Sequence, residues 1–407
     1  MKKYIYILLI NILISSNFTT AGWILQNSGT TVNLNSINFS HGDEDIAWAC
    51  GDNGVILYTS NGGTNWIQQN SGTANNLYSI VFIEIADGPV FAIGAGGTIL
   101  KTTNDGANWF SVPSPTTATL RDFSDFNFII VGDNGTILKG TNTGLNWSII
   151  PSPVTRRLNA VCATFSYYAV GDSGTILKGF SLGTNWVPVN SGTSNNLYGV
   201  PLFGSADITV GDNGLVLRST NNGTNWFNPV TGTGSRLRAV EYSVNNTSRI
   251  YACGNNGTIL KSTNNGVNWG FQSSPTTQNL NSTFFYLNDN TGYICGNSGT
   301  ILKTTNGGGQ ISFLNNTGKT VPNFYNLYQN FPNPFNPETK IKFDLPKNSF
   351  VTLKVYDMLG REVASLVSEQ LTAGSYEIPF SGISSGVYFY KLETPYFTEV
   401  KKMLMIK

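Results

Sequence analysis

A pattern of short apolar runs separated by polar turns repeats seven times along the chain. In the second copy the runs are NLYSIVFIEI, PVFAIG, TILKTT and NWFSVPS, with GAGG and NDGA as two of the separating turns. Short runs of this kind, bounded by Gly, Asn and Asp, predict β-strands that are joined by tight turns. We therefore expect each copy to form a four-stranded antiparallel unit.

The repeat keeps a strict register that starts at a Gly-x-x-Gly turn. The copies open 38 to 43 residues apart, at Gly51, Gly94, Gly132, Gly171, Gly211, Gly254 and Gly296. In the first six copies a Trp follows fifteen residues after the opening Gly: Trp66, Trp109, Trp147, Trp186, Trp226 and Trp269. A period near forty residues is typical of arrays in which each unit buries its faces against its neighbours.

The seventh copy lacks this Trp, and the N-terminal segment offers a matching strand. The sequence from Trp23 reads WILQNSG, close to the WIQQNSG that starts at Trp66. A closed ring protects strand edges that an open stack of sheets would expose. The sequence thus predicts an all-β chain in which 22–305 is a seven-bladed β-propeller and the N-terminal strand closes the last blade.

Composition and charge narrow the class of protein. Charged residues make up 12% of the chain, the formal net charge is +1, and Gly is abundant, which is typical of a folded β protein. Without a basic excess, nucleic acid is not expected as a partner. Lys2 and Lys3, an apolar run and small residues up to Ala21 predict a secretory signal peptide at 1–21. No other run is long enough for a transmembrane helix in the mature chain.

The cysteines favour packing over disulfides or metal binding. Cys50, Cys253 and Cys295 each stand directly before the opening Gly, where the other copies have Ile or Val, and Cys162 stands alone. A position shared with Ile and Val indicates a buried apolar slot. The one histidine, His41, is interpreted as a loop residue. We expect no metal site and no cofactor.

Two turn motifs carry family resemblances. The S-T-N-N-G-x-N-W element resembles the Asp-box, or BNR, repeat of sialidases and sortilin-type propellers, where it is a structural turn. With its L-x-x-V, A-V-G, G-x-I-L-x-T and N-G-G-x-x-W signals, the 22–305 region is similar to the photosystem II assembly and stability factor family of seven-bladed propellers. The resemblance implies the fold, and it does not imply photosynthesis or catalysis.

Carboxylates inside the Gly-x-x-Gly turn raise the question of calcium. Four copies have Asp at the second position, namely Asp52, Asp133, Asp172 and Asp212, whereas the others have Ala or Asn there. An Asp side chain can accept a hydrogen bond from the backbone two residues on and so cap the turn. The sequence favours this Asx-turn cap over a calcium site.

The positions beside the first Leu of each innermost strand vary between copies, unlike the turns. If these strands line the axis, the variable residues ring one mouth of the channel. The candidate ligand-binding residues are Tyr78, Arg121, Arg157, Asn159, Tyr198, Arg236 and Arg238. Arg, Tyr and Asn bind and stack on planar or sugar-like ligands, and the resembled factors carry an arginine patch on one face. The alternative is that these residues are polar because strand entries are exposed to water.

A second basic set follows T-I-L in the third strand: Lys101, Lys139, Lys178, Arg218, Lys261 and Lys303. Its regular spacing favours a solvated strand face over a binding belt. For catalysis, a sialidase-like glycoside hydrolase would need an Arg cluster, a Tyr and a carboxylate to converge at the mouth. The propeller has few glutamates (Glu44, Glu84 and Glu241), and no motif places them beside such a cluster. The first hypothesis is a non-catalytic propeller that binds a protein or a glycan; the hydrolase is the alternative.

The repeat ends near Asn306, and the remainder has a different character. Residues 306–325 are interpreted as a linker, and period-two alternation in 326–407 predicts a small Ig-like β-sandwich. This region is similar to the type A C-terminal sorting domain of the type IX secretion system of Bacteroidota. The matching positions are Pro332, Asn333, Pro334, Phe335, Asn336, Pro337, Gly360, Gly386, Tyr388, Lys401 and Lys402. The resemblance implies the type IX secretion machinery as a partner and a destination outside the outer membrane, secreted or on the cell surface.

Overall fold

The computed structural model describes residues 22–406 except 41–42, 84–87, 142, 164–166, 202–203, 205, 244, 286–289, 310, 312–314, 317–320, 337, 372 and 381–383. The predicted signal peptide at 1–21 lies outside the described residues, and so do His41, Glu84 and Pro337. The described part is all-β, with short 3-10 turns as its only helical elements.

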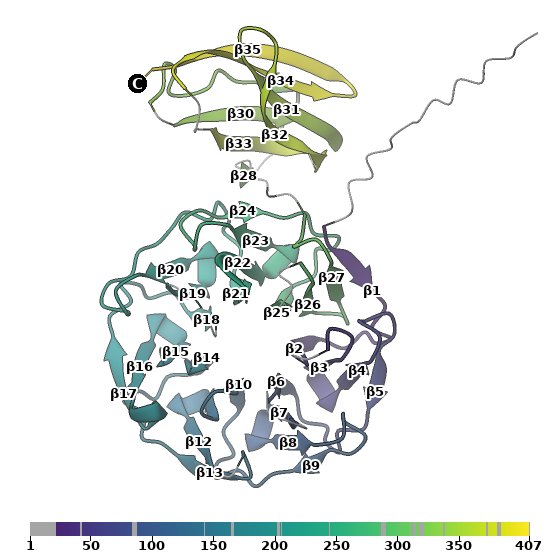
Figure 1. The fold of residues 1–407 in the computed structure, drawn as a ribbon, viewed down its shortest axis with the longest axis vertical. Helices are drawn as coiled ribbons and strands as arrows, with labels where there is room; N and C mark the ends of the chain where they lie inside the picture. Colours follow the sequence, from purple (N-terminus) through teal and green to yellow (C-terminus); the bar gives the residue numbers. More distant parts are fainter. Residues whose placement is uncertain are drawn as a thin grey trace, which may run out of the picture.

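Seven sheets stand around a central axis, as Figure 1 shows. The first three blades are β2 (Leu34–Phe39), β3 (Ala47–Gly51), β4 (Ile56–Thr59) and β5 (Ile67–Gln69); β6 (Leu77–Phe82), β7 (Val90–Gly94), β8 (Ile99–Thr102) and β9 (Phe110–Ser111); and β10 (Leu120–Ser124), β11 (Ile129–Gly132), β12 (Ile137–Thr141) and β13 (Asn146–Ile149). The fourth to sixth are β14 (Leu158–Ala163), β15 (Tyr167–Gly171), β16 (Ile176–Phe180) and β17 (Asn185–Val189); β18 (Leu197–Gly199), β19 (Asp207–Gly211) and β20 (Val216–Ser219); and β21 (Leu237–Ser243), β22 (Asn246–Gly254), β23 (Ile259–Ser262) and β24 (Gly270–Phe271). The first strand of each blade lies innermost.

The last blade is completed by the N-terminal strand. It consists of β25 (Leu280–Phe285), β26 (Gly292–Gly296), β27 (Ile301–Thr304) and β1 (Ile24–Gln26). Strand β1 pairs antiparallel with β27, and the indole N–H of Trp23 donates to Oε1 of Gln272 at 3.1 Å. The predicted closure of the ring is confirmed.

The fifth blade departs from the four-strand prediction. Its sheet has three strands, and the segment after Trp226 contributes only an isolated bridge between Arg218 and Phe227. Pro229 follows closely, and a proline has no N–H with which to extend a ladder. Repetition of the turns therefore does not guarantee repetition of the outermost strand.

The core lies between adjacent blades and uses the register that the sequence indicates. Cys50, Cys253 and Cys295 are fully buried and unbridged, which confirms the apolar slot. The Asp-box tryptophans also pack between adjacent blades, closer to the outer edge of the propeller. The indoles of Trp147, Trp186 and Trp269 donate to a glycine carbonyl three residues earlier, at 2.9 to 3.1 Å.

The second basic set joins each blade to the next, a contact that the sequence did not predict, and all of its side chains except that of Lys261 remain partly exposed to solvent. Each side chain donates to the carbonyl of the residue before the conserved Gly in the following Asp-box turn. The pairs are Lys101 with Thr143 (3.4 Å), Lys139 with Leu182 (3.0 Å), Lys178 with Asn222 (2.7 Å), Arg218 with Asn265 (2.7 Å), Lys261 with Gly307 (2.8 Å) and Lys303 with Gly62 (2.7 Å). The first blade has Tyr58 at this position, and Trp48 and Gln69 bind the carbonyl of Asp105 instead.

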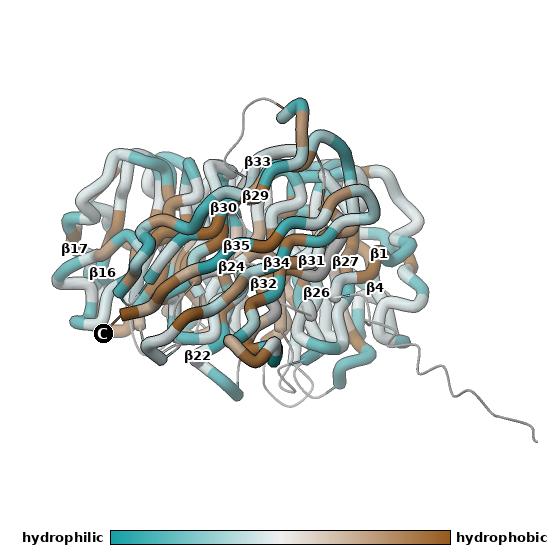
Figure 2. The backbone as a smooth tube through the Cα atoms, turned by 90° about the horizontal axis from the view of Figure 1, so that it is seen from above, coloured by the Kyte–Doolittle hydropathy of each residue, from teal (hydrophilic) through white to brown (hydrophobic). Residues whose placement is uncertain are grey.

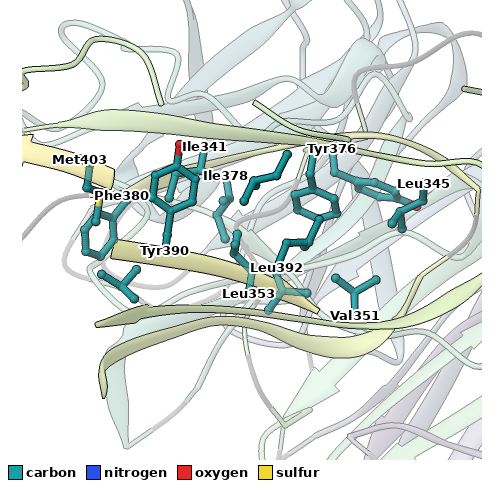
Figure 3. Close-up of a cluster of buried hydrophobic side chains, with 14 of the residues drawn as sticks. Ile341, Leu345, Val351, Leu353, Tyr376, Ile378, Phe380, Tyr390, Leu392 and Met403 are labelled. Atoms are coloured by element: carbon teal, nitrogen blue, oxygen red, sulfur yellow. The ribbon is translucent and has the colours of Figure 1, made fainter. Parts of the chain in front are cut away.

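The C-terminal region forms two four-stranded sheets that pack face to face. One contains β28 (Asn315–Asn316), β33 (Gly374–Phe380), β30 (Thr339–Leu345) and β29 (Asn326–Leu327); the other contains β32 (Glu362–Leu371), β31 (Ser349–Tyr356), β34 (Gly386–Thr394) and β35 (Phe397–Met405). Figure 3 shows apolar side chains such as Ile341, Leu353 and Leu392 meeting between the sheets. In Figure 2, hydrophobic stretches follow the strands of this sandwich. The predicted β-sandwich is confirmed.

Candidate functional site

A β-bulge in every innermost strand directs one side chain toward the channel mouth. The pairing register shifts directly after the first Leu of the strand in all seven blades. A bulge leaves its extra residue out of the ladder and re-aims the side chain. The residues at this position are Asn35, Tyr78, Arg121, Asn159, Tyr198, Arg238 and Asn281.

The Gly-x-x-Gly turns lie at this same mouth, because the Leu that starts the inner strand pairs with the opening Gly. In the third blade Leu120 pairs with Gly132, and the backbone N–H of Asp133 donates to the carbonyl of Thr119 at 2.8 Å. The turn itself is closed by the backbone, where Thr136 N–H donates to the Asp133 carbonyl at 3.1 Å. The Asp carboxylates thus remain available for the residues at the bulge.

The carboxylates bind mouth residues, so the predicted Asx-turn cap is wrong. Asp133 accepts from Nε and Nη2 of Arg121 at 2.9 and 3.1 Å, and Arg157 of the fourth blade approaches the same carboxylate through Nε at 3.0 Å. Burial raises the pKa of Asp133, but the hydrogen bonds and charges of the two arginines outweigh it and hold that pKa below its usual range.

Tyr78 completes this first cluster from the second blade. The guanidinium of Arg121 lies over its ring, 4.5 Å from the centroid. Arg157 is the more exposed arginine, with 44% of its side chain accessible against 21% for Arg121. Three of the predicted residues, from three consecutive blades, are therefore brought together around Asp133.

A second cluster forms between the fifth and sixth blades. Arg236 binds Asp212 through Nε at 2.6 Å and lies over the ring of Tyr198 at 4.7 Å, and the Tyr198 hydroxyl is 3.4 Å from the same carboxylate. Arg238 donates to Oδ1 of Asn255 at 2.8 Å, and burial and then the charge of Arg236 lower its pKa. The arrangement repeats the first cluster: a tyrosine of one blade stacks on an arginine of the next.

Asn159 has a structural role that similar residues share. Its amide donates to Asp172 at 3.0 Å and to the Leu197 carbonyl of the next blade at 2.8 Å. Asn35 and Asn281 make the same pair of contacts. Exposure of the strand entries to water therefore explains these asparagines incompletely, because each amide joins the turn of its own blade to the inner strand of the next.

Below the mouth, the channel holds a cavity of about 130 Å³ on the axis, with Ser36, Ser79, Asp122, Asp125 and Glu241 in its lining. Burial raises the pKa of Asp122 to about 6, although Val161 N–H and the Ser79 hydroxyl bind its carboxylate. At the same register the first and seventh blades have serines, which bind the backbone N–H of the next blade in the same way. Asp122 is therefore a charged variant of a structural contact.

The described residues contain no group of three or more His, Cys, Asp or Glu side chains arranged to hold a metal ion. In the part of the chain that the structure describes, no helix has the length and hydropathy required to span a bilayer.

The sorting motif residues meet the last strand of the sandwich. Phe335 is buried, and its backbone exchanges hydrogen bonds with Leu404 and Ile406 of the C-terminal segment. Asn333 accepts from Leu404 N–H at 2.9 Å, while Pro332 accepts from Thr339. Gly386 and Tyr388 pair with Met405 and Met403, and Gly360 takes a positive φ in the β31–β32 turn. Pro334 and Asn336 flank Phe335.

Two family models match the chain. The model described as photosynthesis system II assembly factor YCF48 matches residues 15–305, and the model described as secretion system C-terminal sorting domain matches residues 329–407. No curated protein matches.

Solved propellers have the same architecture. The chain is similar to YCF48 from Cyanidioschyzon merolae, with a TM-score of 0.58 and 19% identity over 69% of this chain and 98% of that one. It is also similar to a structure of YCF48 bound to D1 peptide, with a TM-score of 0.59 and 19% identity over 70% and 95% of the two chains. The RRP9 WD40 repeats give a TM-score of 0.57 at 8% identity over 70% and 97%. At these identities the likeness shows the fold alone.

Proposed function

The chain belongs to the family of the photosynthesis system II assembly factor YCF48, and from this membership we propose that its propeller is a non-catalytic module that binds a polypeptide segment at the arginine and tyrosine mouth. The C-terminal sorting domain marks the protein for type IX secretion. The binding then takes place on the outer cell surface or in the medium.

The observation that carries the proposal is the pair of clusters at the mouth. In each cluster a guanidinium stacks on a tyrosine ring, Arg121 on Tyr78 and Arg236 on Tyr198. Ion pairs with Asp133 and Asp212 hold the two guanidinium groups in place. Preorganised arginines and tyrosines lose little conformational entropy on binding, and arginines bind carboxylates in a bidentate manner. Such clusters suit carboxylate and backbone carbonyl groups of a peptide.

The charge of the mouth favours a ligand of mixed character. Four arginines (Arg121, Arg157, Arg236 and Arg238) stand with four aspartates (Asp52, Asp133, Asp172 and Asp212), so the formal charges balance. A polyanion needs a net basic surface, whereas a polypeptide can present a few carboxylates between neutral groups. The peptide in one YCF48 structure supports a polypeptide over a glycan.

The hydrolase alternative is less well supported. Arg, Tyr and a carboxylate do converge, which is the feature that such an enzyme would need. However, Asp212 and Asp133 are engaged by arginines, and burial raises the pKa of Tyr198, which makes its hydroxyl a weaker nucleophile.

The test is binding of the purified protein to a peptide array and a glycan array, followed by titration of the best peptide. We expect Arg121→Ala and Arg238→Ala each to weaken binding about 10- to 100-fold, as loss of a charge-assisted hydrogen bond does. Arg249→Ala is the matched control, since Arg249 stands five residues from the mouth end of β22. Peptide binding that survives both mouth substitutions would exclude this site, and binding to glycans alone would exclude a peptide ligand.

A further inference from the structure

The β31–β32 turn of the sandwich presents two apolar side chains on a rigid tip. Met358 and Leu359 are 71% and 78% exposed, in the presence of the rest of the chain. The carboxylate of Asp357 accepts from the N–H groups of Leu359 and Arg361 at 2.9 and 3.0 Å and from Arg361 Nε at 2.7 Å. Gly360 adopts a φ of +76°. The turn is therefore fixed by its own polar contacts while its apolar residues point outward.

The tip continues into one face of the sheet β32-β31-β34-β35. Tyr356 pairs with Phe389, and Phe389 pairs with Lys402, so these three side chains lie in one row. Their neighbours Val355, Tyr390 and Met403 are fully buried in the core. Because side chains alternate along a strand, the row must lie on the outer face.

The two terminal lysines of the motif face opposite sides of the sheet. Lys401 lies on the core side and is paired with Glu399 at 2.8 Å. Lys402 is exposed on the outer face and takes part in none of the ion pairs found among the described residues, whereas Lys354 and Lys391 on that face are paired with Glu362 and Glu393.

We propose that this surface, formed by Met358, Leu359, Tyr356, Phe389 and Lys402, is the docking site for a protein receptor of the secretion machinery. The receptor offers an apolar pocket for the tip and a carboxylate for Lys402. A sorting domain has to be recognised by a protein, and the chain's own propeller leaves the tip uncovered. Exposed apolar anchors on a preorganised element, with a charge beside them, are typical of interaction hot spots. The proposal rests on the export role of the tail and is independent of the mouth.

The test is export of the full-length protein in the producing bacterium, measured as the ratio of surface plus medium to periplasmic protein. We expect Met358→Ser/Leu359→Ser and Lys402→Glu each to lower this ratio roughly tenfold or more, as truncation of a hot spot does. Lys347→Ala, which removes a lysine charge just before β31 begins, and Tyr396→Ser, in the β34–β35 turn, both lie at the end of the sheet away from the tip and should export normally. The swap Met358→Leu/Leu359→Met should also export normally, because it keeps the apolar volume.

Three outcomes overturn the proposal. The first is normal export of Met358→Ser/Leu359→Ser or of Lys402→Glu. The second is a loss with Lys347→Ala as large as that with Lys402→Glu. The third is a crosslink only to lipid or to a second copy of the chain. Thermal melting of each purified variant is the folding control; if the double Ser variant is unfolded, Lys402→Glu and a photo-crosslinker at Leu359 decide. An adduct with a protein of the outer membrane supports the proposal, whereas an adduct only with lipid or a second copy overturns it. Truncation before Asn326 distinguishes failure of the docking surface from failure of the sorting role itself. Surface display of the truncated form would refute the sorting role of the tail.

Discussion

Replacing Trp23 with Ala should destabilise the propeller by about 3–5 kcal/mol, the usual cost of removing a buried Trp. Trp23 is 3% exposed, packs edge-on against Phe285 with the ring centroids 5.9 Å apart, and donates to Gln272 at 3.1 Å. Gln272 in turn donates to the Gly307 carbonyl at 2.9 Å, so the closing strand, the sixth blade and the last turn are linked through one amide. Strand β1 is only three residues long and depends on this anchor.

Tryptophan fluorescence during urea unfolding is the appropriate assay, because all eight tryptophans lie in the propeller and none in the sandwich. Trp23→Phe keeps the ring contact but removes the N–H donor to Gln272, so it should cost about 1 kcal/mol. Trp226→Ala is the matched control. That indole is partly exposed, its N–H has no hydrogen-bond partner, and its strand is reduced to a single bridge. If Trp23→Ala proves no more destabilising than Trp226→Ala, the closing strand does not hold the ring together.

Three further predictions concern stability. Burial raises the pKa of Asp122 to about 6, so the protonated carboxyl stabilises the fold below the unfolded pKa of about 3.9. This stability is lost as the pH rises through 6, by up to about 3 kcal/mol. Asp122→Asn should flatten this part of the pH profile of stability, measured by urea titrations. Lys303→Met should lower the free energy of unfolding by about 1.5–3 kcal/mol, because it removes the 2.7 Å hydrogen bond to the Gly62 carbonyl. Lys101→Met should lower it less, because the hydrogen bond of Lys101 is 3.4 Å long. Equal losses of stability in urea unfolding would contradict the role of these bonds. Tyr390→Phe should destabilise the sandwich by about 1–3 kcal/mol, since its hydroxyl joins Asn330 N–H and the Tyr328 carbonyl at 2.8 Å each. The measurement is the urea transition seen in tyrosine absorbance and absent from tryptophan fluorescence, and an unchanged midpoint of that transition would contradict the role of the hydroxyl.

The sequence was sufficient for the repeat, the ring closure and the buried cysteine register, because each of these depends on local periodicity. The fifth blade shows the limit of this reasoning. Its turns repeat like the others, yet the outermost strand is reduced to one bridge at Phe227, since Pro229 follows two positions later. Strand length depends on pairing along the whole edge, and turn motifs do not report it.

The contacts between blades could not be read from one repeat at a time. Lys303 binds Gly62 across the closure, and Arg157 reaches back to the carboxylate of the preceding blade. The turn motif alone predicts a local cap for the Asp133 carboxylate, because its actual partners, Arg121 and Arg157, lie 12 and 24 residues away in sequence. Strand pairing alone would not predict the contact, because the residues that follow Leu120 and Gly132 run in opposite directions in an antiparallel pair; the bulge after Leu120 turns Arg121 toward Asp133.

The same comparison separates scaffold from candidate function at the mouth. At the position before the first Leu, Asn33, Asn76, Asn196 and Asn279 each accept a backbone N–H from the turn of the preceding blade. One amide is enough for this structural contact. Arg157 and Arg236 occupy the same position and contact the preceding turn through Nε, with 44% and 37% of their side chains exposed. A guanidinium carries more donors than the contact requires. The spare guanidinium donors, which the ring does not need for its stability, are therefore the candidates for ligand binding. Arg157→Asn should keep the contact with the preceding turn and remove these spare donors. The variant should preserve the melting temperature and lose peptide binding.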